Sequence, residues 1–388
     1  MKKSMFVAAA VLAVAAFTWG AEPVKFTDPN LKTIVEKTLG VAEPTPEDML
    51  RLTRLYAGAH DIADLGGLEH AASLTSLCLH RNKISDIAPI AKLNKLTYLC
   101  LHDNAVEDIS PIKELTGLVN LLLYGNKIAD LSPVAHLTEL TSLYVNNNRL
   151  TDIAAAAGLT KLRFLDVSNN ELIDVSPAAG LSELADLRLN GNRITDLSPL
   201  EALDRLKAVW VFDNTASIPA KWKDAQIAIW LDAAQYAGSA LDAPRGKLAC
   251  KGEIGSFIVK RGNCYIRTSA DADGVDLPEG EYRMANWEIE KKDSDGALWK
   301  LTAVLRAENK GVFTIAEGQT QTLEIGEPII GSVTANKGRS AYSFGQTLAG
   351  RMGETITIMR EGARPAPPKL HIRNKDGDYE QTFNFEYG

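Results

Sequence analysis

The sequence lacks the motifs by which many hydrolases and nucleotide-binding enzymes are recognised. It contains no HExxH, no GxSxG and no phosphate-binding loop, and no GxGxxG lies between a strand and a helix. Its six histidines form no recognisable catalytic triad. We therefore expect a protein that is not an enzyme and that uses no cofactor.

Basic patches and membrane-spanning runs are also missing from the mature sequence. The formal net charge is −7, and no arginine cluster or basic stripe interrupts this acidic balance. Nucleic acid is therefore not an expected partner. No stretch beyond the N-terminal region is long and apolar enough to cross a bilayer, so we predict no transmembrane anchor.

The N-terminal segment has the composition of a secretory signal peptide. Lys2 and Lys3 precede an apolar run from Met5 to Phe17, and small residues follow. We predict a signal peptide over residues 1–20, with cleavage near Gly20 and an earlier alternative at Ala15–Ala16. The mature protein is then secreted or periplasmic.

A frame of 22 residues repeats eight times without an insertion. The repeats begin at Leu52, Leu74, Leu96, Leu118, Leu140, Leu162, Leu184 and Leu206. A fixed period of this length is typical of a solenoid, in which each unit buries its apolar edge against its neighbours. Such scaffolds display surfaces for binding, which favours recognition over catalysis.

Within each unit, the pattern LxxLxLxxNxI predicts a short strand and a tight turn. Leu74, Leu77 and Leu79 would point into the core, with the intervening side chains facing solvent. An asparagine recurs in seven units, at positions 82, 104, 126, 148, 170, 192 and 214, and His60 takes its place in the first. We expect its amide to satisfy buried backbone groups where each coil bends.

A second column places an aspartate four residues after the asparagine. It comprises Asp64, Asp86, Asp108, Asp130, Asp152, Asp174 and Asp196, with proline three residues later in five units. An aspartate before a proline predicts a capped 3₁₀ or α turn on the outer face. We interpret the column as structural and not as an acid–base or metal array.

These units resemble the 22-residue, internalin-like class of bacterial leucine-rich repeats, with their Asp-Ile-x-Pro-Leu stretch. The resemblance covers roughly residues 26–218. It implies an α/β solenoid of parallel strands with short 3₁₀ or α turns over residues 52–218. It also implies a helical N-terminal cap over residues 21–51, which agrees with the helix-start residues Asp28 and Pro29 and the stop at Gly40.

After the last repeat, the pattern changes. We predict a helical or irregular C-terminal cap and linker over residues 219–245 and a β-sandwich region over residues 246–388, because the spacing there alternates as in strands. A break near residue 328 would divide that region into two modules. The stretch from Leu277 to Arg283 resembles a hairpin of prealbumin-like and immunoglobulin-like bacterial modules.

The solvent-facing strand positions predict the binding surface. They are rich in aromatic and mixed polar side chains and carry little aligned charge, which suits a protein or peptide partner. The candidate contact residues are Tyr98, Tyr124, Tyr144, Phe164, Arg188, Trp210 and Phe212. A neighbouring cap or domain that covers some of these aromatics is the structural alternative.

Two other functions remain open. In the first, the protein is a structural envelope component that acts through its β region, with the repeats as a spacer. In the second, the β region binds glycans through exposed aromatics such as Trp287 and Trp299.

The four cysteines form two separate groups. Cys78, His80, Cys100 and His102 fall on one face of adjacent strands, and three interpretations stay open: repeat similarity without a site, a metal site, and a disulfide. Cys250 and Cys264 both lie in the β region. A disulfide between them would suit an exported protein, and two buried thiols are the alternative.

Overall fold

The computed structural model describes most of the chain after the predicted signal peptide. The described residues are 21–223, 225–238, 243–251, 256–269, 274–292, 296, 298–305, 311–324, 330–337, 342–349, 355–360, 369–373 and 380–384. The predicted signal peptide and the predicted break near residue 328 lie outside them.

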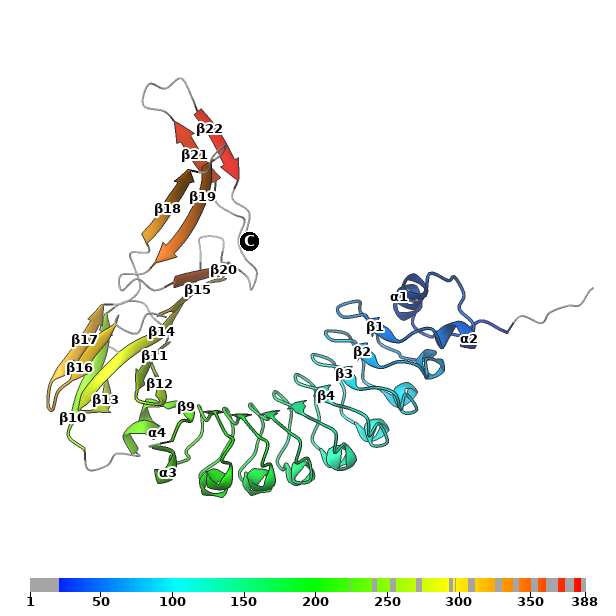
Figure 1. The fold of residues 1–388 in the computed structure, drawn as a ribbon, viewed down its shortest axis with the longest axis horizontal. Coiled ribbons are helices and arrows are strands. Elements are labelled where there is room, and N and C mark those ends of the chain that lie inside the picture. Colours follow the sequence, from blue (N-terminus) through cyan, green and yellow to red (C-terminus); the bar gives the residue numbers. More distant parts are fainter. Residues whose placement is uncertain are drawn as a thin grey trace, which may run out of the picture.

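A helical cap precedes the solenoid (Figure 1). Helix α1 (Pro29–Leu39) begins where the Asp28 carboxylate accepts hydrogen bonds from the backbone N–H groups of Asn30 and Leu31. It ends at Gly40, whose φ of 69° is favourable for glycine. Helix α2 (Pro46–Met49) follows a capping box between Thr45 and Asp48.

Eight parallel three-residue strands line the inner side of a curved solenoid, and 3₁₀ turns line the outer side (Figure 1). The strands are β1 (Arg54–Tyr56), β2 (Ser76–Cys78), β3 (Tyr98–Cys100), β4 (Asn120–Leu122), β5 (Ser142–Tyr144), β6 (Phe164–Asp166), β7 (Asp186–Arg188) and β8 (Ala208–Trp210). The turns are η1 (Leu68–His70), η2 (Ala88–Ile90), η3 (Ser110–Ile112), η4 (Ser132–His136), η5 (Ala154–Ala156), η6 (Ser176–Gly180) and η7 (Ser198–Ala202). The predicted leucine-rich repeat solenoid is confirmed.

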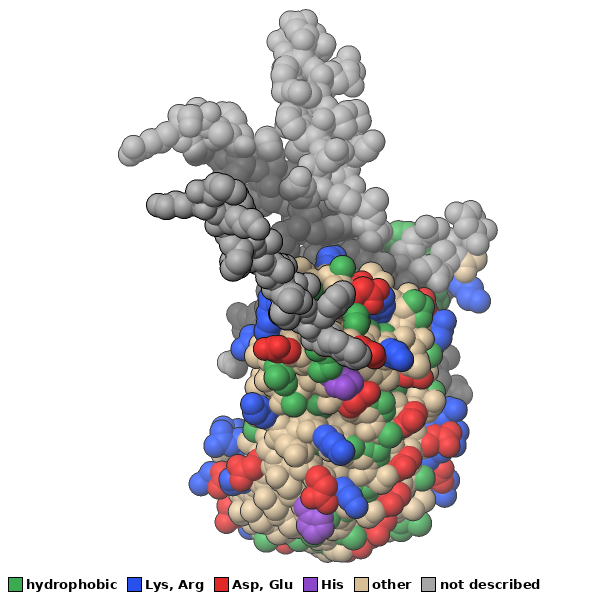
Figure 2. All heavy atoms as spheres, turned by 90° about the vertical axis from the view of Figure 1, so that its right-hand side faces the viewer, with side chains coloured by type: hydrophobic (Ala, Val, Ile, Leu, Met, Phe, Trp, Pro, Cys, Tyr) green, Lys and Arg blue, Asp and Glu red, His purple; other side chains and the backbone are tan. Residues whose placement is uncertain are grey.

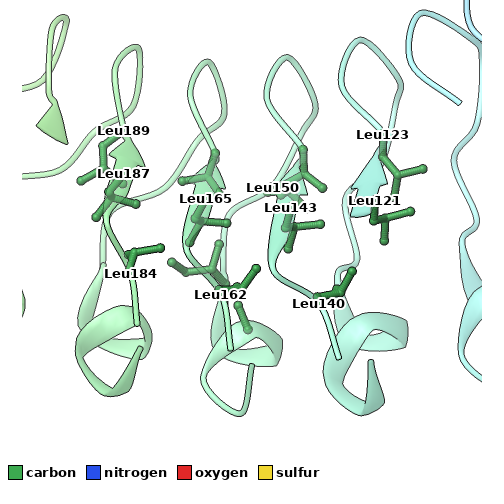
Figure 3. Packing of buried hydrophobic residues seen from close by; sticks show 14 of the residues in the cluster. Leu121, Leu123, Leu140, Leu143, Leu150, Leu162, Leu165, Leu184, Leu187 and Leu189 are labelled. Carbon is green, nitrogen blue, oxygen red and sulfur yellow. The ribbon is translucent and has the colours of Figure 1, made fainter. Parts of the chain in front are cut away.

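The leucines of successive coils form one continuous core (Figure 3). Leu121, Leu143 and Leu165 occupy matching strand positions and are completely buried. Full burial of a leucine contributes about 2 kcal/mol. The stacked coils share this core, so each coil depends on its neighbours for its stability.

The asparagine column joins neighbouring coils. The Asn126 amide nitrogen donates to the carbonyl oxygens of Leu101 (3.0 Å) and Leu123 (2.8 Å), and its oxygen accepts from the N–H of Val106 (3.0 Å). In the first coil, where His60 replaces asparagine, Asp28 of the cap accepts a hydrogen bond from the N–H of Ala63 (2.8 Å). The cap thus satisfies a backbone group of the first coil.

The sheet continues beyond the repeats. Strand β9 (Ala228–Asp232) pairs in parallel with β8, and β12 (Cys264–Ser269) pairs in parallel with β9. We predicted a helical or irregular cap here, and the structure instead places this strand between the short helices α3 (Ala220–Lys223) and α4 (Ala233–Gly238). Ile229 and Leu231 face the core while Trp230 faces the concave side, which favours a strand.

The remainder of the described chain is mainly β-strand. Its strands are β10 (Arg245–Lys251), β11 (Ser256–Arg261), β13 (Val275–Pro278), β14 (Gly280–Lys292), β15 (Leu298–Val304), β16 (Val312–Ile315), β17 (Thr320–Glu324), β18 (Ile330–Lys337), β19 (Tyr342–Ala349), β20 (Thr355–Arg360), β21 (Lys369–Arg373) and β22 (Glu380–Asn384). Eight of these later strands, counting β12, join the repeat strands and β9 in one seventeen-stranded sheet, while β13, β10 and β17 form a second. The sandwich arrangement itself stays a prediction.

No helix in the described part of the chain has the length and apolar character needed to cross a membrane. Seen from the capped end, the described surface intersperses acidic and basic side chains (Figure 2).

Candidate functional site

The candidate surface is the concave face of the solenoid, lined by strands β1 to β9 and extended by β12 (Figure 1). Strand register aligns Tyr144, Asp166, Arg188, Trp210 and Trp230 in one row. Five of the seven predicted contact residues lie on these strands, Tyr124 and Phe212 lie two residues past the ends of β4 and β8, and all seven are half-buried. Tyr144, Phe164, Arg188 and Trp210 contact one another in sequence, Tyr124 stacks on His102, and Phe212 contacts Trp230.

The C-terminal half of this face carries a continuous stack of side chains, here called the aromatic row: Tyr144, Phe164, Arg188, Trp210, Trp230 and Tyr265. The rings of Tyr144 and Phe164 stack at 4.4 Å. The Arg188 guanidinium lies between two rings, 5.0 Å from the centre of Phe164 and 4.8 Å from that of Trp210. Each contact restricts the rotamers of its neighbours.

The aromatic row continues past the repeats. Trp230 stacks on Trp210 with ring centres 5.7 Å apart and on Tyr265 at 4.0 Å. Phe212 meets Trp230 edge-on, and the Arg267 guanidinium lies 4.6 Å from the Phe212 ring centre. Sequence reasoning missed Trp230, Tyr265 and Arg267 because all three follow the last 22-residue unit. The alternation of Ile227, Ile229 and Leu231 was the available signal for β9.

Two carboxylates, those of Asp166 and Asp186, meet Arg188 of the aromatic row. Arg188 lies 3.8 Å from an Asp166 oxygen through Nη1 and 3.7 Å from Asp186 Oδ1 through Nε. The sequence predicted little aligned charge on this face, whereas the structure gathers two carboxylates and one guanidinium. Asp166 is only 5% exposed, and it accepts a hydrogen bond from the Ser168 N–H.

Burial determines the electrostatics of this cluster. It raises the pKa of Asp166 and that of Asp186 above the ordinary aspartate value, although Arg188 opposes the shift. Asp186 Oδ1 and Arg188 Nε are buried and have no hydrogen-bond partner within the described residues. These two atoms face each other as an ion pair at 3.7 Å, beyond hydrogen-bond distance.

The N-terminal half of the face holds the cysteine and histidine pairs. The Cys78 sulfur lies 3.3 Å from His80 Nδ1. The His80 ring stacks on His102 at 4.8 Å, and His102 stacks on Tyr124 at 4.1 Å. His102 Nδ1 lies 3.0 Å from an Asp103 oxygen, and the donor atoms that lie within 4.8 Å of one another belong to the other three side chains, Cys78, His80 and Cys100.

The two thiols are buried, although their positions were predicted to face solvent. Cys78 is 8% exposed and Cys100 is 1% exposed, because neighbouring side chains cover them. Their mutual hydrogen bond lowers the pKa of Cys78 to about 5 and raises that of Cys100. Burial raises the pKa of nearby Tyr98 to about 12. The pair thus differs chemically from two independent thiols.

The other predicted cysteine pair lies in the β region. Cys250 belongs to β10 and Cys264 to β12, in two different sheets, and both are buried. Their disulfide stays a prediction.

A hollow of about 260 Å³ lies on the outer face, away from these residues, between η3 and η4. Its Asp108 and Asp130 carboxylates accept hydrogen bonds from Ser110 and Ser132, which stabilise the turns. We therefore assign no site to it.

Comparison with known proteins places the repeats among characterised solenoids. The family model described as "Leucine Rich repeats (2 copies)" matches residues 72–114, 116–158, 138–183 and 160–202. A comparison with curated protein sequences gives no match.

Two solved structures from Listeria monocytogenes are similar to the chain. Internalin C2 (inlC2) is 31% identical with a TM-score of 0.52, and the match covers 54% of this chain and 98% of that one. The internalin inlF is 29% identical with a TM-score of 0.51, over 56% of this chain and 72% of that one.

Proposed function

Because the chain belongs to the internalin-like leucine-rich repeat proteins, we propose that it is an exported, non-catalytic protein that binds a protein or peptide partner on its concave face. The basic and apolar N-terminal segment supports export. The aromatic row and the two carboxylates that contact its Arg188 make the C-terminal half of the face the primary contact area.

The observation that carries this proposal is the mutual restriction of the aromatic row. Arg188 lies between Phe164 and Trp210 and also contacts two carboxylates, so its side chain is ordered before any partner arrives. A pre-ordered surface loses little conformational entropy on binding. Tryptophan, tyrosine and arginine are also the residues that dominate binding energy at protein interfaces.

Ring orientation favours a peptide over a sugar. The rings of Trp210, Trp230 and Tyr265 stack with interplanar angles of 10°, so that their faces are largely occupied by one another. Ring edges and polar ends remain to meet a partner, and these suit backbone and side-chain hydrogen bonds.

The glycan alternative is weakened by the structure. Trp287, one of its two supporting aromatics, is completely buried in the β region. A side chain without exposed surface cannot stack on a sugar.

The test begins with capture of envelope and culture-fluid components on the mature protein. The affinity of the captured partner is then measured by calorimetry for Tyr144→Ala and Trp210→Ala. We expect each substitution to weaken binding by about 1–2 kcal/mol or more, as interface hot spots do. Circular dichroism checks that both variants fold.

Tyr56→Ala is the matched control, because Tyr56 is a 63% exposed aromatic on the same face at the opposite end of the solenoid. It should bind as the unaltered protein does. If both Tyr144→Ala and Trp210→Ala retain full affinity, the proposal that the partner binds on the concave face is wrong. The β region would then be the part of the protein that binds, and the repeats would act as a spacer.

A further inference from the structure

We propose that Cys78, His80 and Cys100 form a binding site for a single thiophilic cation of the Zn²⁺ class on the N-terminal half of the concave face. Their three donor atoms lie within 4.8 Å of one another. Within the described residues, this is the group of cysteine, histidine and acidic side chains that meets such a spacing. The site is separate from the aromatic row and independent of the proposed partner.

The donor set fits zinc. Two thiolates and one imidazole are ligands that Zn²⁺ takes in proteins, at about 2.3 Å for sulfur and 2.0–2.1 Å for nitrogen. Ligands of one tetrahedral ion lie roughly 3.3–3.8 Å apart by these bond lengths. The 3.3 Å between Cys78 Sγ and His80 Nδ1 is within about 0.3 Å of the separation of a sulfur and a nitrogen ligand, and Cys100 Sγ lies within 4.8 Å of both atoms.

Strand register explains why the ligands meet. Cys78 and Cys100 pair directly across β2 and β3, and His80 follows Cys78 by two residues, on the same side of the chain. The side-chain hydrogen bond between Tyr98 and Cys100 orients the second thiol from outside the ligand set. Adjacent coils thereby bring a cross-strand pair and one flanking histidine to a single point.

The neighbouring coil makes room for the imidazole. In the first repeat, the position equivalent to His80 is Gly58, and a Cβ atom built there would lie 2.1 Å from the His80 ring. A larger residue at Gly58 would displace that ring. On its other side His80 stacks on His102, which in turn contacts Asp103 and Tyr124. The imidazole is therefore held on both sides with Nδ1 toward Cys78.

Burial leaves one coordination position for an outside ligand. Both sulfurs are nearly inaccessible, whereas His80 is half-buried at the surface of the face. Three protein ligands fill three corners of a tetrahedron, and the fourth points to the concave side, where water or an external ligand completes it.

The experiment uses the full mature chain, fully reduced and freed of metal with a chelator. Co²⁺ is titrated as a spectroscopic probe, and Zn²⁺ affinity is measured by competition with a chromophoric chelator. We expect one equivalent of Co²⁺ to produce thiolate-to-cobalt charge-transfer absorption and the intense visible bands of tetrahedral cobalt. Zn²⁺ should abolish both signals.

Cys100→Ser and His80→Ala test the ligands separately. Loss of an outer hydrogen-bond partner already weakens metal sites by about 10–100-fold, so loss of a ligand should weaken Zn²⁺ binding by at least about 100-fold. His80→Ala removes a side chain outside the leucine core and keeps the test informative if the buried cysteine variant fails to fold. His136→Ala removes an exposed histidine of the outer face and should leave binding unchanged.

Three results would overturn the proposal. The first is the absence of the cobalt spectrum from the reduced protein, and the second is persistence of that spectrum in both Cys100→Ser and His80→Ala. The third is recovery of a Cys78–Cys100 disulfide-linked peptide from protein isolated with a thiol-blocking reagent, because a disulfide would consume the thiolates that the ion requires.

Discussion

Among individual side chains, the asparagines do most to connect one coil to the next. Each amide satisfies carbonyl groups of its own coil and of the preceding one, while its oxygen accepts an N–H from that preceding coil. These backbone groups lie where the chain bends away from the strand, so they cannot hydrogen-bond to a neighbouring strand of the sheet. An unsatisfied buried group of this kind costs about 1–3 kcal/mol.

Replacing Asn126 with alanine should therefore lower the free energy of unfolding by about 3 kcal/mol, since several backbone groups lose their partner together. Urea denaturation of the purified protein measures the change. Asn94→Ala is the control, because Asn94 is exposed in a connecting loop. Equal stability of the two variants would contradict the structural role assigned to the column.

The aspartate column stabilises the first residues of the 3₁₀ turns on the outer face by accepting hydrogen bonds from them. In η4, Asp130 accepts hydrogen bonds from both the N–H and the hydroxyl of Ser132, each at 2.8 Å. The same pair of bonds recurs at η3, η6 and η7 through Asp108, Asp174 and Asp196. The carboxylates are thus engaged in the turns themselves.

Asp130→Ala should destabilise the protein by about 1 kcal/mol at neutral pH, because the N–H and the hydroxyl of Ser132 lose their acceptor. The hydrogen bonds from Ser132 lower the pKa of Asp130. A lowered pKa means stability that is present above the unfolded-state pKa and lost as pH falls through the folded-state value. The difference between variant and parent should therefore shrink in acid.

Urea titrations at neutral pH and near pH 3 measure this difference. Glu114→Ala removes the same charge from an exposed position and serves as the control. A stability difference for Asp130→Ala that is equal at both pH values would show that the carboxylate charge plays no part.

Taken as one body, the protein has a continuous sheet that passes from the repeats into the β region. Strand β9 is paired on one edge by β8 and on the other by β12. Arg267 of β12 strengthens this junction, because its Nε donates to Asp232 Oδ1 at 2.8 Å and its Nη2 to Asp213. The last strand of the solenoid is therefore covered, which protects an edge that would otherwise be free to pair with another chain.

Arg267→Ala should loosen this junction. We expect a loss of about 1–2 kcal/mol, typical of charge-assisted hydrogen bonds at a partly buried site. Hydrogen exchange should accelerate for amides of β9 and β12 more than for those of β3 and β4. Arg163→Ala, at an exposed position of the sixth coil, is the control, and uniform acceleration along the solenoid would contradict the assignment.

The features that recur with the 22-residue repeat could be predicted from the sequence. The buried leucines, the inward strands and the capped turns follow from residue types that recur in phase, so their local environments recur as well. Register then fixed which side chains share the concave face, and Tyr144, Phe164, Arg188 and Trp210 lie together as that register requires.

Features that do not recur with the 22-residue repeat were not predicted from the sequence. Trp230 and Tyr265 reach the concave face through long-range strand pairing that no local pattern specifies. The burial of Cys78, Cys100 and Asp166 depends on the rotamers of neighbouring rings and guanidinium groups, which alternation along a single strand cannot reveal.

Stacking of coils also gives the protein a mechanical character. Each coil is bonded through its strand and its asparagine to the coils before and after it. Under tension applied to the two ends, a terminal coil should detach first and transfer the load to the next. Each detached unit of 22 residues would release roughly 75 Å of extended chain. The solenoid should therefore lengthen under force in regular steps, as a spring that yields one turn at a time.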